Sequence, residues 1–205
     1  MSRPTRALAL PAALAVLITT AVVAQVVAQD VSRADADRMG KKMQAIVQRA
    51  ILVPAKAAPL KTTFTERELN AYLLHHGTEQ LPTGVTKARV TMLETNKLET
   101  RAVVDLDAVR TSQPRGWLDP LGYVTGSLEV VTIGMFSGSG GQGVYRFESG
   151  TVAGVPIPRA VMQEVIAYYS RSPELPKGIN LDEPFPLPAG IREVQVRRGA
   201  ATVVQ

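Results

Sequence analysis

The sequence contains no cysteine. Disulfide bonds and thiolate metal sites are therefore excluded, and no lipid-attachment cysteine follows the N-terminal apolar run. Aromatic residues are also scarce, at 5% of the chain with a single tryptophan. A domain of this size can fold without disulfides, and the low aromatic content favours an aliphatic, loosely filled interior.

Histidine is almost as rare, since His75 and His76 are the only two in the chain. Neighbouring residues on a helix point about 100° apart, so this pair cannot hold one metal ion as an i, i+4 pair can. No acid stands at the spacing of a His-Glu-x-x-His site. We interpret both histidines as packing residues, and we expect no metal, no cofactor and no enzymatic activity.

A glycine-rich stretch at residues 138–143 matches the dinucleotide-binding pattern G-x-G-x-x-G. That fingerprint requires a helix directly after it. Here the sequence VYRFES follows and alternates as a strand does, so we predict a hairpin loop. No Gly-x-Ser-x-Gly elbow surrounds Ser137 or Ser139, which leaves a hydrolase of that type without support.

Four acidic residues are candidates for chemistry. Asp105 and Asp107 stand two apart on a predicted strand and would share its polar face. Paired carboxylates can act as acid and base, but a solvated polar face is the simpler interpretation. Glu66 and Glu68 are interpreted as capping and surface residues of a helix.

The net charge is +5, and it falls to +3 without residues 1–28, which contain two arginines and no acid. The positive charge is spread along the chain in short pairs such as Lys41-Lys42. A nucleic-acid-binding protein usually concentrates it on one face. We therefore expect no nucleic-acid partner.

The N-terminus has the pattern of an export signal. Two arginines precede a run without charge from Ala7 to Ala28, and cleavage is possible after Ala24 or Ala28. The run is also long enough to span a bilayer if it is retained. Residues 1–28 are predicted to be a signal peptide or a membrane anchor, and membrane association is possible through residues 7–28.

Two helices are expected next. Residues 32–51 place Met39, Met43 and Ile46 on one stripe at helical spacing. Prolines end this helix, so residues 31–62 are predicted to be a helix and a linker. Thr65 and Glu68 then form a Thr-x-x-Glu capping box for a second helix, with Phe64 and Leu69 placed as a hydrophobic staple. Gly77 is expected to end it with a left-handed cap.

From Val85 onward the hydrophobic period changes from 3.6 to 2. Two strand pairs follow, the second formed by residues 123–136 and 144–155. A helix over residues 158–170 and a closing hairpin that turns at Arg198-Gly199 complete the chain. Long strands joined by hairpins predict an antiparallel sheet. The fold class is therefore α+β, with a long curved antiparallel sheet wrapped around one or two amphipathic helices, and residues 63–205 form a single domain.

Two loops could contact a partner. Trp117 lies in the loop PRGWLDPLG, where it could cover a ligand or meet a membrane, although packing onto the core is the simpler role. The sequence PFPLPAG, residues 184–190, could present a polyproline ligand, and a rigid connector is again simpler.

The sequence FTERELNAYL, with ESGTVAGVPIPRAVMQEVI and PFPLPAGIREVQVRRGAATV, resembles a group of uncharacterised bacterial envelope proteins that open with a Thr-Glu-x-Glu-Leu-Asn helix. The resemblance covers about residues 62–205. More distantly, such proteins are similar to the tubular lipid-binding superfamily, in which a bent antiparallel sheet wraps a long helix and leaves an apolar groove. The resemblance implies an exported protein, periplasmic or anchored to the inner membrane facing the periplasm, and it carries no catalytic residues.

Two functions stay open. In the first, the sheet and its helices bind lipid or another apolar ligand, and small residues such as Ala102 and Gly134 leave room for it. The speculative lining is aliphatic: Leu69, Leu73, Val90, Val104, Leu128 and Val130. In the second, the interior is fully packed and the protein is a structural or interaction module of the envelope, with an unknown protein partner.

Overall fold

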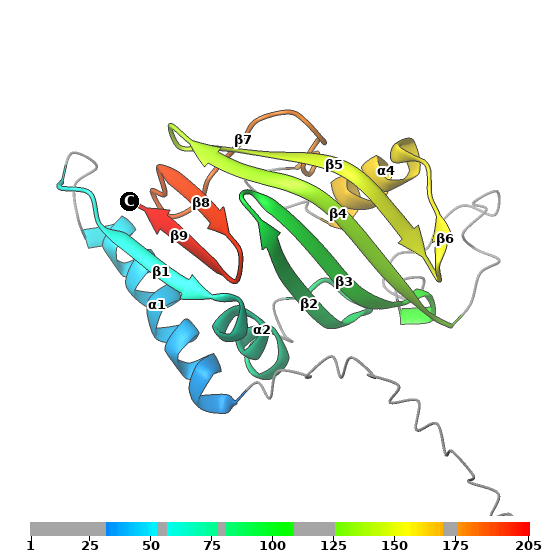
Figure 1. Cartoon of the computed structure of the whole chain (residues 1–205), viewed down its shortest axis with the longest axis horizontal. Helices are drawn as coiled ribbons and strands as arrows, with labels where there is room; N and C mark the ends of the chain where they lie inside the picture. The colour runs from blue at the N-terminus through cyan, green and yellow to red at the C-terminus, as the bar shows by residue number, and fades with distance from the viewer. Residues whose placement is uncertain (1–31, 53–56, 78–80, 109–125, 170–175) are drawn as a thin grey trace, which may run out of the picture.

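The structure is a computed structural model that describes residues 32–52, 57–77, 81–108, 126–169 and 176–205 (Figure 1). It confirms the α+β class with one large antiparallel sheet. The predicted signal or anchor segment and Trp117 lie outside the described residues.

Three helices lie with both ends inside the described residues: α1 spans Arg33–Leu52, α2 spans Glu66–His75 and α4 spans Arg159–Tyr169. The predicted capping box at the start of α2 is present. The Thr65 hydroxyl accepts from the Glu68 backbone N–H at 3.1 Å, and the Glu68 carboxylate accepts from the Thr65 N–H at 2.8 Å. These bonds satisfy amides that the first helical turn leaves unpaired.

Within the described residues the sheet has nine strands, all paired antiparallel. They are β1 Lys61–Thr65, β2 Val85–Glu94, β3 Lys97–Asp105, β4 Ser127–Ser139, β5 Gln142–Val152, β6 Val155–Pro156, β7 Phe185–Pro186, β8 Glu193–Arg197 and β9 Ala200–Val204. Strand β1 lies on residues that were predicted to be a linker or an extended crossing and the flank of the second helix, and it crosses the predicted boundary at residue 62. Its short sequence Lys-Thr-Thr-Phe-Thr becomes a strand because β9 offers it an edge.

The strand order is β1-β9-β8-β4-β3-β2, with β5 along the other edge of β4. Strands β4 and β8 share one pair, Gly138 with Val194. Past this pair, the turn between β2 and β3 lies between β4 and β8. The Asn96 N–H donates to the Val196 carbonyl of β8 at 3.0 Å, and the Phe136 N–H of β4 donates to the Asn96 carbonyl at 2.7 Å. The β8–β9 hairpin thus joins the long hairpins as one continuous sheet.

The glycine-rich stretch is a hairpin turn, as predicted. Strand β4 ends at Ser139 and β5 begins at Gln142, so the loop is Gly140-Gly141, with φ of 59° and 79°. Two positive φ angles give a turn whose twist matches that of the strands, and glycine adopts them without a steric penalty. The dinucleotide interpretation is thereby excluded, because no helix follows.

Four local predictions are wrong. Gly77 does not adopt a left-handed conformation; the N–H groups of His76 and Gly77 both bond the Tyr72 carbonyl instead. Residues 144–155 do not form one strand, because Ala153 and Gly154 turn the chain from β5 into β6.

The acidic residues supply the other two corrections. Strand β3 ends at Asp105, whose carboxylate accepts from the N–H groups of Asp107 and Ala108 at 2.9 and 3.1 Å, so the two aspartates do not share a strand face. Glu68 is not a surface residue, since it is only 6% exposed.

The core lies where the two halves of the sheet meet. Met92 of β2, Val196 of β8 and Ala201 of β9 are buried together, and Phe64, Leu69, Leu98, Phe136 and Val194 pack against them. Both members of the predicted staple, Phe64 and Leu69, therefore contact this core.

Candidate apolar ligand face

One face of the long strands is apolar, and the register identifies it. Ala102 of β3 lies opposite Val130 of β4, which lies opposite Val152 of β5. Residues directly opposite each other point to the same side, as do residues two apart on a strand. The apolar residues of this face are Val90, Met92, Leu98, Ala102, Val104, Leu128, Val130, Phe136 and Val152, and Thr100 and Thr132 lie among them.

The other face of the same strands is mixed. It carries the charged residues Glu99, Arg101 and Glu129 together with the apolar residues Val103, Val131, Ile133 and Met135. Arg101 on β3 forms ion pairs with Glu129 of β4 at 3.0 Å and with Glu99 of its own strand at 3.3 Å. These hydrogen bonds raise the pKa of Arg101, the bond to Glu129 most of all. Such exposed pairs contribute little stability, but they make this the more polar of the two faces.

Helix α2 covers one end of the apolar face, and its position is fixed by the edge of β2. The Asn70 amide donates to the Val90 carbonyl and accepts from the Val90 N–H, both at 2.8 Å, and Glu66 accepts from the Met92 N–H at 2.7 Å. Residues four apart on a helix are separated by about 6 Å along its axis. Two residues of a strand span nearly the same length. Helix α2 therefore bonds the free edge of β2 in place of another strand.

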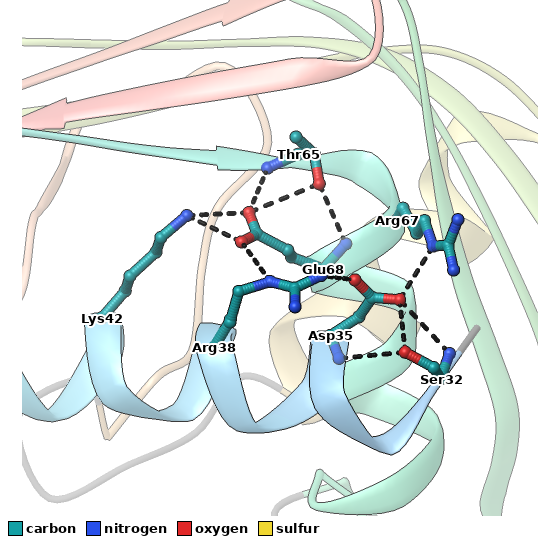
Figure 2. Close-up of polar contacts among 7 residues, drawn as sticks. All are labelled: Ser32, Asp35, Arg38, Lys42, Thr65, Arg67 and Glu68. Carbon is teal, nitrogen blue, oxygen red and sulfur yellow. Dashed lines mark hydrogen bonds and ion pairs between the residues drawn. The ribbon is translucent and has the colours of Figure 1, made fainter.

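Helix α1 holds α2 through a polar cluster (Figure 2). Lys42 donates to both Glu68 oxygens at 2.8 Å, and Arg67 donates to Asp35 at 2.8 Å. Arg38 contacts both carboxylates, bonding Asp35 and lying 3.6 Å from Glu68. The two carboxylates are 2% and 6% exposed, and three cations pair with them. Charges buried to this degree are stable only when they are paired.

The cluster lowers the pKa of both carboxyl groups. For Asp35 the hydrogen bond from the Ser32 hydroxyl is the strongest cause, followed by opposing desolvation and then the Arg67 bond. For Glu68, desolvation raises the pKa most, but the bonds from Lys42 and Thr65 together outweigh it. Both groups are therefore held in their charged form in the fold.

Helix α4 contacts the opposite end of the apolar face. A β-carbon at Gly150 of β5 would lie 3.0 Å from the terminal methyl of Met162, which is 1% exposed. The Gln163 side chain of the same helix accepts from the Leu181 N–H at 2.6 Å. This bond holds the segment around Leu181 against α4. Between this end and α2, the apolar residues Val90, Ala102 and Val130 are only half-buried.

All six residues predicted to line a ligand site are half-buried. Val90, Val104, Leu128 and Val130 lie together on the apolar face, and Leu69 packs on the core at its α2 end. Leu73 follows one turn later on α2. The structure thus gathers five of them on one side of the sheet, and Asn70 and Glu66 are the positioning residues that sequence reasoning missed.

The space above one predicted small lining residue is filled. A β-carbon at Gly134 would lie 2.6 Å from the Tyr145 ring and 2.7 Å from the Arg146 carbonyl. Burial raises the pKa of Tyr145, whose hydroxyl bonds Thr132. The glycine at this position serves the packing of Tyr145 rather than an open cavity.

Two hollows in the described surface lie away from the predicted lining. One, about 830 Å³, lies between the start of α2, the end of β2 and the β8–β9 turn; the other, about 320 Å³, lies between the end of α1 and residues 187–192. Both are lined by arginine as well as apolar residues, and neither contains any of the six.

The histidines take part in helix packing. His76 lies 2.7 Å from Asp37 of α1 and packs edge-to-face on Tyr72, with ring centroids 5.9 Å apart. His75 is half-buried beside it. Within the described ranges no three metal-ligating side chains come together, and no helix there is both long and apolar enough to cross a bilayer.

No known protein family, curated protein or solved structure matches this chain. The resemblance to envelope proteins and to the tubular lipid-binding superfamily therefore stays a prediction.

Proposed function

We propose that the protein is exported and binds lipid or another apolar ligand on the apolar face of β2–β5, between α2 and α4, without catalysing a reaction. One observation carries the proposal. Val90, Ala102, Val104, Leu128 and Val130 share one face of the long strands and stay partly exposed, whereas the opposite face carries the ion pairs of Arg101.

The energetics favour an occupant. Covering aliphatic surface contributes about 0.8 kcal/mol for each CH₂ group removed from water. An acyl chain with eight methylenes on this face would gain about 6 kcal/mol before the entropy cost of binding. The side chains would also lose the exposure that they keep in the free protein, which adds to the gain.

The location follows from the sequence. The uncharged run from Ala7 to Ala28 after two arginines supports export to the periplasm, with the domain either released or anchored at the inner membrane. An exported protein meets lipid at the membrane surface, so the compartment and the ligand class agree.

A packed interaction module is the second candidate, and Tyr145 favours it. Its ring fills the space over Gly134, and the Phe185 ring likewise lies 2.9 Å from where a β-carbon of Gly143 would be. Side chains thus close the sheet at the end near β7. In this alternative a protein partner, rather than a lipid, covers the remaining apolar residues.

The test is uptake of a fluorescent fatty acid by the wild type and by two phenylalanine variants of β3. Ala102→Phe fills the proposed site, whereas Val103→Phe adds its ring to the opposite face of the same strand. We expect saturable uptake by the wild type and the Val103 variant, with at least a tenfold loss in Ala102→Phe. Circular dichroism checks that both variants fold. Equal uptake by all three, or none by the folded wild type, contradicts the proposal.

A further inference from the structure

The end of α1 and the start of β1 form an exposed apolar corner. Val47, Ile51, Leu52 and Leu60 are 50%, 75%, 77% and 47% exposed, and together they make up half of the large apolar side chains exposed in the described parts of the chain. Single exposed aliphatic residues are ordinary, but a contiguous group on a soluble surface marks a contact site.

Hydrogen bonds hold the end of α1 beside the start of β1. Arg49 donates to the Ala58 carbonyl at 2.6 Å, and the Gln205 side chain donates to the Ile46 carbonyl at 2.8 Å. Leu60 exchanges two backbone bonds of 3.1 Å with Gln205, so it lies next to the last turns of α1. Figure 1 shows the end of α1 and the start of β1 together at one corner of the molecule.

The segment that forms this corner carries charge of one sign. From Arg38 to Thr65 the chain has six basic residues and no acid. Arg38 and Lys42 are bound to the carboxylates of the α1–α2 cluster. Lys41, Arg49 and Lys61 are left without a carboxylate partner within the part of the chain that the structure describes.

We infer that this corner inserts into the surface of an anionic lipid bilayer. Apolar side chains enter the boundary between headgroups and acyl chains, while the lysines and arginine around them meet anionic headgroups. Charge selects this occupant over a second copy of the chain, because two copies meeting here would bring their basic groups together. The inference goes beyond the proposed ligand face and does not depend on it.

A single fluorescent label reports insertion, because the chain has no cysteine of its own. Leu52→Cys in the full-length chain is labelled with an environment-sensitive dye and mixed with vesicles of phosphatidylglycerol and phosphatidylcholine, or of phosphatidylcholine alone. Val155→Cys is the matched control, since Val155 is also apolar and 64% exposed but lies in β6. We expect a blue shift, and quenching by lipid-attached quenchers, at position 52 only and on the anionic vesicles only.

The role of the basic residues is tested by adding Lys41→Gln or Lys61→Gln to the labelled Leu52→Cys chain. Each is expected to weaken binding to anionic vesicles about fivefold. Four results overturn the inference: no shift at position 52, equal shifts at 52 and 155, equal shifts on both kinds of vesicle, or a label shielded before vesicles are added. The last means that a second copy or residues 1–31 cover the corner. Each readout is independent of fatty-acid uptake, so this inference and the proposed function can fail separately.

Discussion

Replacing Asn70 with alanine tests how α2 is held at the edge of the sheet. The side chain is 6% exposed and makes two bonds of 2.8 Å to the backbone of Val90. Each such bond contributes about 1 kcal/mol net, and leaving the two backbone groups unpaired adds to the loss. We expect Asn70→Ala to lower the free energy of unfolding by about 2 to 4 kcal/mol, a large part of the total for a domain.

Urea unfolding followed by circular dichroism measures this loss as a lower midpoint at an unchanged slope. Asn70→Asp separates the two bonds, because a carboxylate can accept from the Val90 N–H but cannot donate to its carbonyl. It should fall between the wild type and Asn70→Ala, or below both if the carboxylate repels that carbonyl. Leu74→Ala is the control on the same helix, at 54% exposure. A loss below 1 kcal/mol for Asn70→Ala, equal to that of Leu74→Ala, would refute the strand-like role of this side chain.

Three further predictions follow from the same contacts. Because the folded-state pKa values of Asp35 and Glu68 are lowered, the stability that they contribute is present above about pH 4.5 and is lost as the pH falls through the lowered values. Glu68→Gln should lower the free energy of unfolding by about 2 kcal/mol at pH 7 and should lose less stability in acid when urea unfolding is repeated at lower pH. An unchanged loss of stability in acid would contradict this. Gly134→Ala should cost about 1 to 3 kcal/mol in thermal unfolding, because its methyl group would meet the Tyr145 ring and a backbone carbonyl, and wild-type stability would mean that Tyr145 does not lie there. Gly140→Asn should leave stability unchanged or raise it by up to about 1 kcal/mol, since asparagine tolerates the positive φ and nothing blocks its side chain, whereas Gly140→Val should lower it.

Much of the fold could be predicted because its local signals agree. The capping box at Thr65 and Glu68, the two-residue turn at Gly140-Gly141 and the alternation in β3 each require only neighbouring residues to specify a structure. Strand β1 could not be predicted, because its pairing with β9 joins residues about 140 apart and its own sequence is too short to show a period.

The site was predictable only in part. Alternation identifies which residues share a face, so Val90, Val104, Leu128 and Val130 could be grouped before the structure was known. The role of Asn70 could not, because a polar residue on a helix looks like a solvated one until the edge of β2 is placed beside it. The spacing of Glu66 and Asn70, four residues apart on one side of α2, was the available signal.

The central claim is that the apolar face of β2–β5 holds a lipid or another apolar ligand. The most direct measurement is native mass spectrometry of the protein purified without detergent, followed by organic extraction of the same sample. We predict a stoichiometric adduct of lipid mass that the solvent releases and that is absent from folded Ala102→Phe. A single ligand-free mass, unchanged after incubation with membrane extract, would contradict the claim and would mean that the sheet is closed by its own side chains or by a protein partner.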